Sequence, residues 1–224
     1  MAAFPQTDQV RRDFDRIATL PATGFDHNAH YHDVLLRALP PHFDRALDVG
    51  CGTGAFARLL AERSGHVEAL DLSPAMITAA RDRSAGHGNI TFEVADVLTR
   101  PLDRDRYDAI ASIATLHHMP LDAVLPRLTE ALAPGGTLVV LDLLDAGGLA
   151  DLPRNAVAWL YARALSVSHR ARTSAAVQQA WMEHGARERY GSWREIAARY
   201  RALLPGVRLR RHLLWRFSAV WLKR

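Results

Sequence analysis

Residues 47–54 read LDVGCGTG, which is the most informative stretch of this 224-residue chain. The apolar run that ends at Val49 predicts a buried strand, and a helix is expected to begin just after Gly54. Glycines in the loop between them allow positive φ angles and let backbone N–H groups approach a ligand closely. Because a helix N-terminus also presents the positive end of the helix dipole, this loop predicts a nucleotide-type binding site.

Strand-like runs and helical stretches alternate from residue 45 to residue 144. Strands are expected at 46–50, 67–71, 90–95, 107–113 and 137–144. Helices are expected between them at 54–64, 74–84 and 121–132. This alternation is typical of βαβ units, so it predicts an α/β fold with a mainly parallel sheet and helices on both faces.

The segments around this core have other patterns. Helices are expected before it at 9–20 and 27–39, and about three helical stretches follow it as an insertion after the fifth strand. Strands at 207–215 and 217–222 predict a C-terminal antiparallel hairpin, with a bend at Arg216 or a turn elsewhere. We expect one domain over 1–224, made of N-terminal helices, a ligand-binding core, a helical cap and the hairpin, at 1–44, 45–144, 145–205 and 206–224.

Composition excludes several classes of protein. A single cysteine, Cys51, excludes an intramolecular disulfide framework and a CxxC-type zinc or redox site. No run of 18 apolar residues is present, so no membrane-spanning helix is expected. The first residues contain no apolar stretch typical of a secretory signal, and a cytoplasmic location is therefore the expectation.

Charge is divided unevenly along the chain. Residues 1–150 carry 13 Arg against 20 Asp and Glu, a net charge of −7, and residues 151–224 carry 14 Arg and one Lys against 4 acids, a net charge of +11. The basic part could meet an acidic small molecule, a nucleic acid or a membrane surface. A solvated helix face would explain the same arginines.

Two acids help to identify the nucleotide. Gly50, Gly52 and Ala55 satisfy the dinucleotide spacing GxGxx(G/A), and Asp71 closes the second strand where a ribose-binding acid is expected. A nicotinamide oxidoreductase therefore fits this spacing. Asp96 follows the third strand in the segment VADVL, and residues 132–143 read LAPGGTLVVLDL.

The glycine loop, Asp71, Asp96 and the Pro-Gly-Gly turn, in this order, resemble the class I S-adenosylmethionine-dependent methyltransferases of the small-molecule type. The resemblance covers residues 28–144 well and extends to the terminal hairpin. It implies a Rossmann-like fold, S-adenosyl-L-methionine as cofactor, and methyl transfer to O, N or C of a small-molecule acceptor.

The resemblance also assigns cofactor contacts. Asp71 would bind both ribose hydroxyls, and Asp96 would meet the adenine amino group. The loop would lie under the methionine and ribose, and the end of the fourth strand would pass close to the sulfonium. The residues it implies are Asp48, Gly50, Cys51, Gly52, Gly54, Asp71, Leu72, Asp96, Val97, Ile113 and Tyr31. The alternative is that these are turn glycines and capping acids, with Asp71 helping Ser73 to start a helix.

Catalytic candidates follow the fourth strand. His117 or His118 could accept a proton from the acceptor, because an imidazole titrates near neutral pH. Both could instead be structural residues at a helix start. No metal is expected, because adjacent histidines rarely bind one ion and no third ligand is obvious. Tyr31, in a polar helix start, could contact the cofactor or pack in the core, and Asp142 could contact the acceptor or cap a helix.

The acceptor is expected to be a small molecule, and an acidic one if the basic segment faces the cleft. Aromatic residues of the insertion would line its pocket or pack in a core. A nucleic-acid methyltransferase is less favoured, because Cys51 is badly placed for catalysis and residues 114–120 read ATLHHMP where an NPPY-like segment would stand. A non-catalytic cofactor-binding partner protein is a further alternative, and a homodimer is possible.

Overall fold

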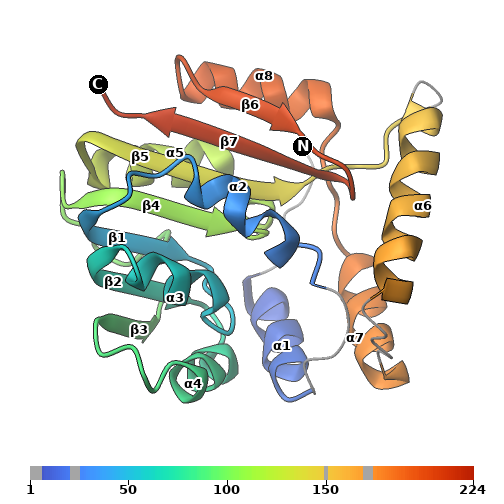
Figure 1. Cartoon of the computed structure of the whole chain (residues 1–224), viewed down its shortest axis with the longest axis horizontal. Helices are drawn as coiled ribbons and strands as arrows, with labels where there is room; N and C mark the ends of the chain where they lie inside the picture. Colours follow the sequence, from blue (N-terminus) through green and yellow to red (C-terminus); the bar gives the residue numbers. More distant parts are fainter. Residues whose placement is uncertain (1–6, 21–25, 149–150, 169–173) are drawn as a thin grey trace.

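The computed structural model describes residues 7–20, 26–148, 151–168 and 174–224. Its centre is one seven-stranded sheet with the order β3-β2-β1-β4-β5-β7-β6 (Figure 1). Strands β1 to β5 are parallel, and β7 runs antiparallel to both β5 and β6. The mainly parallel sheet with a terminal antiparallel pair is therefore confirmed. The strands are β1 Phe43–Val49, β2 Ser64–Asp71, β3 Ile90–Val94, β4 Tyr107–Ile113, β5 Leu132–Leu143, β6 Arg208–Arg211 and β7 Arg216–Leu222.

Helices cover both faces of this sheet. Along β5, Val139 and Leu141 pack into one buried cluster, and Leu138 and Val140 pack into the other. Such continuous apolar strands are what a parallel sheet buried on both faces requires. The first face carries α2 His32–Leu36, α3 Ala55–Ala61 and α4 Pro74–Arg83, and the second carries α5 Leu121–Ala131 and α8 Trp193–Leu203.

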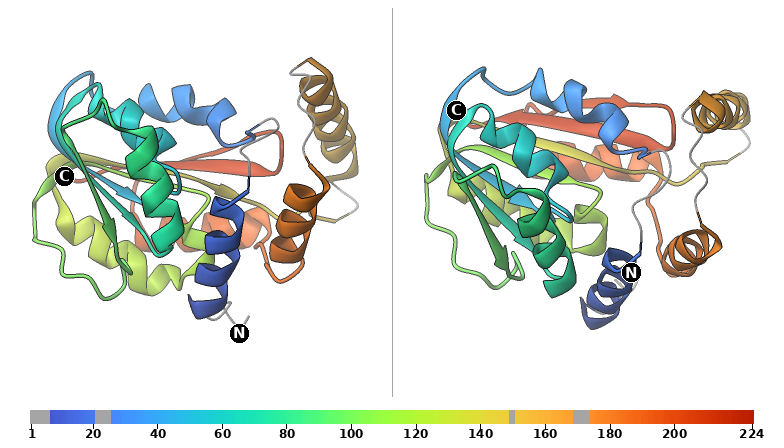
Figure 2. Two further views of the ribbon diagram at one scale, coloured as in Figure 1. Left: turned by 90° about the horizontal axis from the view of Figure 1, so that it is seen from below. Right: turned by 60° about the horizontal axis from the view of Figure 1, so that its bottom comes forward.

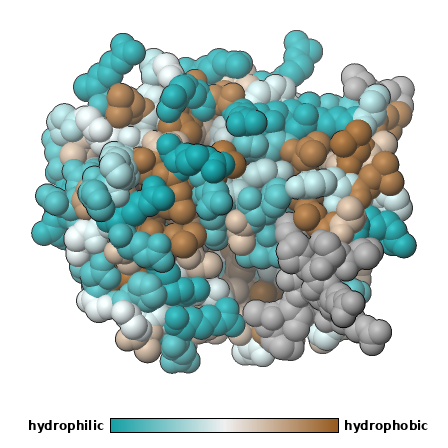
Figure 3. All heavy atoms as spheres, viewed as in Figure 1, coloured by the Kyte–Doolittle hydropathy of each residue, from teal (hydrophilic) through white to brown (hydrophobic). Residues whose placement is uncertain are grey.

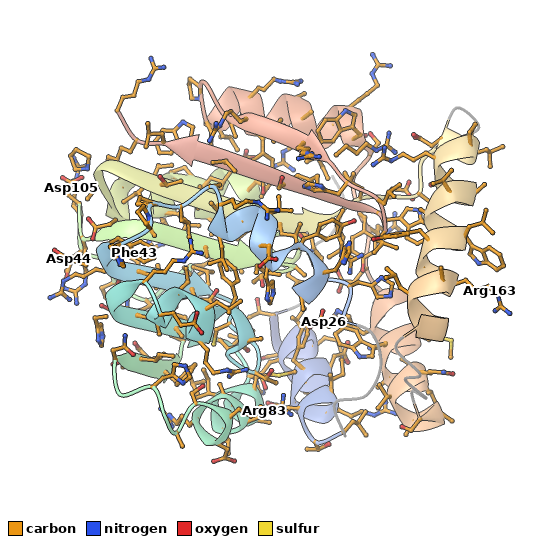
Figure 4. All side chains as sticks on the ribbon, in the orientation of Figure 1. Asp26, Phe43, Asp44, Arg83, Asp105 and Arg163 are labelled. Atoms are coloured by element: carbon orange, nitrogen blue, oxygen red, sulfur yellow. The ribbon has the colours of Figure 1, made fainter. Side chains whose placement is uncertain are left out.

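Three further helices lie beyond the carboxyl ends of the strands, as Figures 1 and 2 show: α1 Thr7–Ala18, α6 Leu152–Ser168 and α7 Ala175–Gly185. Phe43 and Asp44, at the start of β1, mark the opposite edge in Figure 4, and Asp26 lies near the carboxyl edge. Arg16 of α1 pairs with Glu183 of α7 at 2.5 Å. The insertion after β5 is thus helical as expected, and its last helix, α8, packs beside α5.

The terminal hairpin has different boundaries from those expected. Strand β6 is short, the connection occupies residues 212–215, and Arg216 is the first residue of β7. Leu214 and Trp215 have φ angles of 57° and 55°, which glycine or asparagine would normally supply in such a turn. Tertiary contacts hold the turn instead, because Leu214 is fully buried and the Trp215 Nε1–H donates to Asn155 Oδ1 at 3.1 Å.

Two other segments differ locally from their predictions. The helix expected at 27–39 is a short 3₁₀ turn, η1 Ala29–Tyr31, followed by α2. Strand β5 begins at Leu132 and includes the Pro-Gly-Gly turn as an irregularity, since its pairing with β4 shifts between Tyr107 and Ala109. Gly135 has a φ of 77°, and its N–H donates to Lys223 O at 2.9 Å, so the turn joins β5 to the end of β7.

The large aromatic residues of the insertion are not all in a core. Trp159 on α6 and Trp181 on α7 are about half exposed, so neither is the core residue that its spacing favours. An apolar surface lies over α6 in Figure 3. The exposed large apolar side chains of this helix are Leu152, Val157, Trp159 and Leu160. In the described residues, no helix is long and apolar enough to cross a membrane.

Candidate active site

The glycine loop after β1 is tight on one side and open on the other. Gly50, Gly52 and Gly54 have φ angles of 71°, 52° and 75°. A Cβ atom on Gly50 would lie 2.2 Å from the Thr115 side chain, whereas a Cβ on Gly52 would meet nothing within 4 Å. The loop lies at the carboxyl end of β1, where the strand order reverses between β1 and β4. Ligands of α/β sheets bind at such a switch point.

Asp71, at the end of β2, is hydrogen-bonded to this loop. Its Oδ2 accepts from the Gly52 N–H at 2.8 Å, and its Oδ1 accepts from the Ser73 N–H at 2.9 Å. Burial raises the pKa of Asp71, and the two backbone N–H donors act in the opposite direction. Because each carboxylate oxygen has two acceptor sites, Asp71 can hold the loop and still bind ribose hydroxyls. Ser73 caps α4, and Asp71 accepts a hydrogen bond from the Ser73 N–H. Asp71 therefore also helps Ser73 to start this helix, as the capping alternative expects.

Asp48, two residues before Gly50, has an unpartnered side-chain oxygen in the described part of the chain. Its side chain is buried, and its Oδ2 has no hydrogen-bond partner in the described residues. Burial and the charge of Asp71 raise the pKa of Asp48 to about 7. Burial also raises the pKa of the Cys51 thiol, which therefore stays protonated and is a poor nucleophile. An open glycine cradle beside an unpaired carboxylate oxygen fits a polar nucleoside such as S-adenosylmethionine.

The predicted adenine contacts follow β3. Asp96 Oδ1 accepts from the Leu98 N–H at 2.8 Å, and the Asp96 carbonyl accepts from Arg100 N–H at 2.8 Å, so this acid caps a turn. Val97 is buried, and its carbonyl accepts from the Arg127 side chain. The turn is therefore held from both ends. Contacts of Asp96, Val97 and Leu72 with adenine stay predictions.

The structure connects Tyr31 to the hairpin turn. Its hydroxyl donates to the Leu213 carbonyl at 2.9 Å, and its ring packs on His212 with centroids 4.9 Å apart. Tyr31 is buried, as the alternative that it packs in the core expects. A contact between Tyr31 and the cofactor stays a prediction. Ile113, the other outlying candidate, is half-buried at the end of β4.

His117 and His118 lie in the short 3₁₀ turn η2, Leu116–His118, but their surroundings differ. His117 Nδ1 lies 2.5 Å from Asp142 Oδ1, and the His117 backbone N–H donates to Asp142 Oδ2 at 3.0 Å. Asp142 is the buried acid near the end of β5. This pair of contacts makes Nδ1 the hydrogen-bonded nitrogen and leaves Nε2 for another partner.

His118 lies instead against α1 and the segment after α7. Its ring packs on Phe14 of α1 and on His184 of α7, with centroids 5.8 Å and 5.3 Å away. Its Nδ1 is 3.3 Å from Glu188 Oε2. Burial lowers the pKa of His118, so the neutral imidazole is favoured. The structure therefore separates the two histidines that the sequence could not distinguish.

A pocket of about 460 Å³ opens beside His117, and we call it the acceptor pocket. It lies at the carboxyl end of β5, because Asp142 and Leu143 line it together with Phe217 of β7. Its other lining residues come from η2, α5, α8 and the segment before α8. They are Leu116, His117, Met119, Leu121, Arg189, Tyr190, Gly191, Glu195, Ile196, Arg199 and Tyr200.

Two residues near this pocket, Arg216 and Tyr190, were not individually assigned to the site from the sequence. Arg216 donates from Nε to Asn28 Oδ1 at 2.9 Å, and burial lowers its pKa although Asp142 and Tyr190 lie nearby. Burial and the charge of Glu188 raise the pKa of Tyr190 to about 12. The only sequence signal was an arginine at the start of the apolar run FSAVWL.

Comparisons with known proteins agree with this geometry. Residues 46–136 match the family model described as a methyltransferase domain. A Mycobacterium tuberculosis protein named as an uncharacterized methyltransferase is 33% identical over 201 residues, which cover 87% of this chain and 94% of that protein. Trans-aconitate 2-methyltransferase of Streptomyces avermitilis is 42% identical over 123 residues, which cover 50% of this chain and 45% of that enzyme.

The fold, the glycine loop and these relatives define a methyltransferase that uses S-adenosylmethionine. The chain belongs to the class I S-adenosylmethionine-dependent methyltransferases. Among solved structures, the N-methyltransferase NodS of Bradyrhizobium japonicum, in complex with S-adenosylhomocysteine, has the same fold. Its TM-score is 0.60 at 17% identity, over 95% of this chain and 97% of that one. A nucleic-acid methyltransferase and a non-catalytic partner protein are not favoured. Membership of this family also argues against a nicotinamide oxidoreductase.

Proposed function

We propose that this methyltransferase acts on a small molecule that carries an anionic group and binds in the acceptor pocket. One observation carries the proposal: the pocket is connected to the cofactor loop through η2. Thr115 packs directly on Gly50, and two residues later His117 lines the pocket. An acceptor beside His117 would therefore lie next to the end of the cofactor where the reacting methyl group is expected.

The methyl group of S-adenosylmethionine is already activated by its sulfonium. The protein therefore mainly has to hold the acceptor atom in line with it and exclude water. In our proposal, Asp71, Asp48 and the loop residues Gly50 to Gly54 hold the cofactor. Asp96, Val97 and Leu72 form the adenine side, and Ile113 borders the sulfonium.

Two arginines at the pocket support an acidic acceptor. Arg189 and Arg199 line it, and Arg189 forms no ion pair with a described residue. These two arginines belong to the basic segment 151–224. The two acids in the lining, Asp142 and Glu195, already contact His117 and the Ser192 N–H. One relative is named trans-aconitate 2-methyltransferase, and aconitate is a carboxylate, although that match covers only half of this chain.

His117 is the stronger catalytic candidate of the two histidines, because it lines the acceptor pocket and His118 does not. Asp142 is a positioning residue that holds its Nδ1. An acceptor that loses its proton needs a base or a Lewis acid beside it. Nε2 of His117 can serve either chemistry, as a base or as a ligand of a metal ion.

A direct test uses the purified protein with S-adenosylmethionine and matched pairs of small carboxylic acids and their neutral amides. We expect S-adenosylhomocysteine to form with one or more acids and not with the corresponding amides. Arg189→Ala should raise KM for such an acid roughly tenfold, as expected for a lost charged hydrogen bond. Arg194→Ala, an exposed arginine that does not line the pocket, is the matched control. Equal turnover of acids and amides would contradict the acidic acceptor.

A further inference from the structure

Three potential metal ligands meet between η2 and the segment after α7. One side-chain atom each of His117, His118 and Glu188 lies within 4.8 Å of the other two. We propose that these three side chains bind a divalent transition-metal ion of the zinc type. Two imidazoles and one carboxylate form the ligand set of open, catalytic zinc sites, in which a fourth position remains for water or substrate.

Unpartnered buried atoms point to a ligand at this place. Both ring nitrogens of His118 and Oε2 of Glu188 have no hydrogen-bond partner in the described part of the chain. The His118 side chain is 7% exposed and that of Glu188 is 2% exposed. Buried polar groups are rarely left unpaired, because each one loses its hydration without compensation. A single cation would supply a partner to both side chains.

The orientation of His117 fits the same ligand. Its Nδ1 is held by Asp142 at 2.5 Å, so the ring presents Nε2 as its free lone pair. Metal-binding histidines commonly give their second nitrogen to a carboxylate, which fixes the ring and strengthens the ligand. In this arrangement Asp142 would be a positioning residue for the metal site.

An ion pair between Glu188 and the histidines is the competing explanation. Glu188 lies 3.3 Å from His118 Nδ1 and 3.9 Å from His184 Nε2, and neither contact has hydrogen-bond geometry. His184 in turn contacts Asp13, which pairs with Arg187. The contact between His118 and Glu188 is close enough for an ion pair, but its geometry leaves both atoms without an aligned hydrogen bond, so a cation between them is the alternative that we propose. The sequence-based expectation of no metal had two grounds, that adjacent histidines rarely bind one ion and that no third ligand was obvious, and Glu188 answers the second.

The site also narrows the acceptor class, a step that depends on the proposed function. Because His117 lines the acceptor pocket, an ion held here would border that pocket. A carboxylate or hydroxyl oxygen of the acceptor would then be its further ligand, and the lone pair of His117 would be a ligand instead of a base.

The test is metal binding by the tag-free full chain after treatment with a chelator. Isothermal titration with Zn²⁺, and visible absorption with Co²⁺, should show one ion per chain. We expect His118→Ala and Glu188→Gln each to weaken binding at least tenfold, and Asp142→Asn to weaken it 10- to 100-fold. His42→Ala, which removes an exposed histidine outside the cluster, should bind like the wild type.

Two results would overturn the metal site: no stoichiometric binding, or binding that persists in both His118→Ala and Glu188→Gln. Circular dichroism shows whether each variant is folded, and Glu188→Gln keeps the shape of the side chain it replaces. Titration of S-adenosylhomocysteine into the same samples separates the two proposals. Cofactor binding without metal binding refutes the metal site alone, whereas loss of cofactor binding in the wild type refutes the methyltransferase site.

Discussion

The cofactor loop and the acceptor pocket are built in different ways. The loop is made of backbone, and its geometry depends on glycines that lie close together in sequence. The pocket is made of side chains from β5, β7, α5, α8 and η2, which are distant in sequence. Where such a backbone loop is closely packed, an added side-chain atom would collide with its neighbours. A site made of side chains can change its ligand through single substitutions that leave the fold intact.

Gly50→Ala should have the largest effect, because it tests the backbone-built region at its tightest point. The added Cβ would lie 2.2 Å from Thr115 at a φ of 71°, so we expect about 2–6 kcal/mol of destabilisation from strain and overpacking. Chemical denaturation and titration of S-adenosylhomocysteine measure the effects on stability and on cofactor affinity.

Gly52→Ala is the matched control, because its Cβ would meet no protein atom. It should cost only about 1–3 kcal/mol of stability, from the left-handed backbone alone. Its methyl group would occupy the open side of the loop, so cofactor affinity should fall more than stability does. Equal destabilisation by Gly50→Ala and Gly52→Ala would contradict the description of the loop as closely packed at Gly50 and open at Gly52.

The raised pKa of Asp48 predicts a pH-dependent contribution to stability from the cofactor region. Its pKa in the folded protein is about 7, against 3.8 for the ordinary side chain, so the native state retains a proton that the unfolded chain releases. The contribution of Asp48 to stability should therefore fall as pH rises from about 4 to 7, by at most about 4 kcal/mol. Asp48→Asn should remove this fall, and thermal unfolding at pH 5 and pH 8 measures it. A variant that gains no stability at pH 8 would show that Asp48 is ionised without cost.

Asp71→Ala tests the side chain that accepts a hydrogen bond from the Gly52 N–H of the loop. It removes acceptors for the Gly52 and Ser73 N–H groups and, in our proposal, for the ribose hydroxyls. Affinity for S-adenosylhomocysteine should fall by about 1–3 kcal/mol. Asp96→Ala is informative beside it, because this acid only caps a turn in the structure. An unchanged affinity in Asp71→Ala would refute its role at the ribose.

The same difference explains what could be predicted from sequence. The sheet, its helices and the glycine loop follow from local patterns, because strand alternation and glycine spacing are short-range features. The turn at 212–215 gave no signal, since Leu214 and Trp215 adopt it only through contacts with distant residues. Likewise, nothing near Glu188 indicates that it lies against His118, because that contact depends on where α7 packs.

Substitutions at Arg199 and Asp122 should have the smallest effects, and they test the acceptor pocket most selectively. They form an exposed ion pair at 2.9 Å between α8 and α5, and Arg199 also lines the acceptor pocket. Arg199→Ala and Asp122→Asn both remove the pair, so each should cost less than about 1 kcal/mol of stability. Only Arg199→Ala removes a cation from the pocket, and it alone should raise KM for an acidic acceptor severalfold. Affinity for S-adenosylhomocysteine should be unchanged in both, and a drop in either would show that the two regions are coupled.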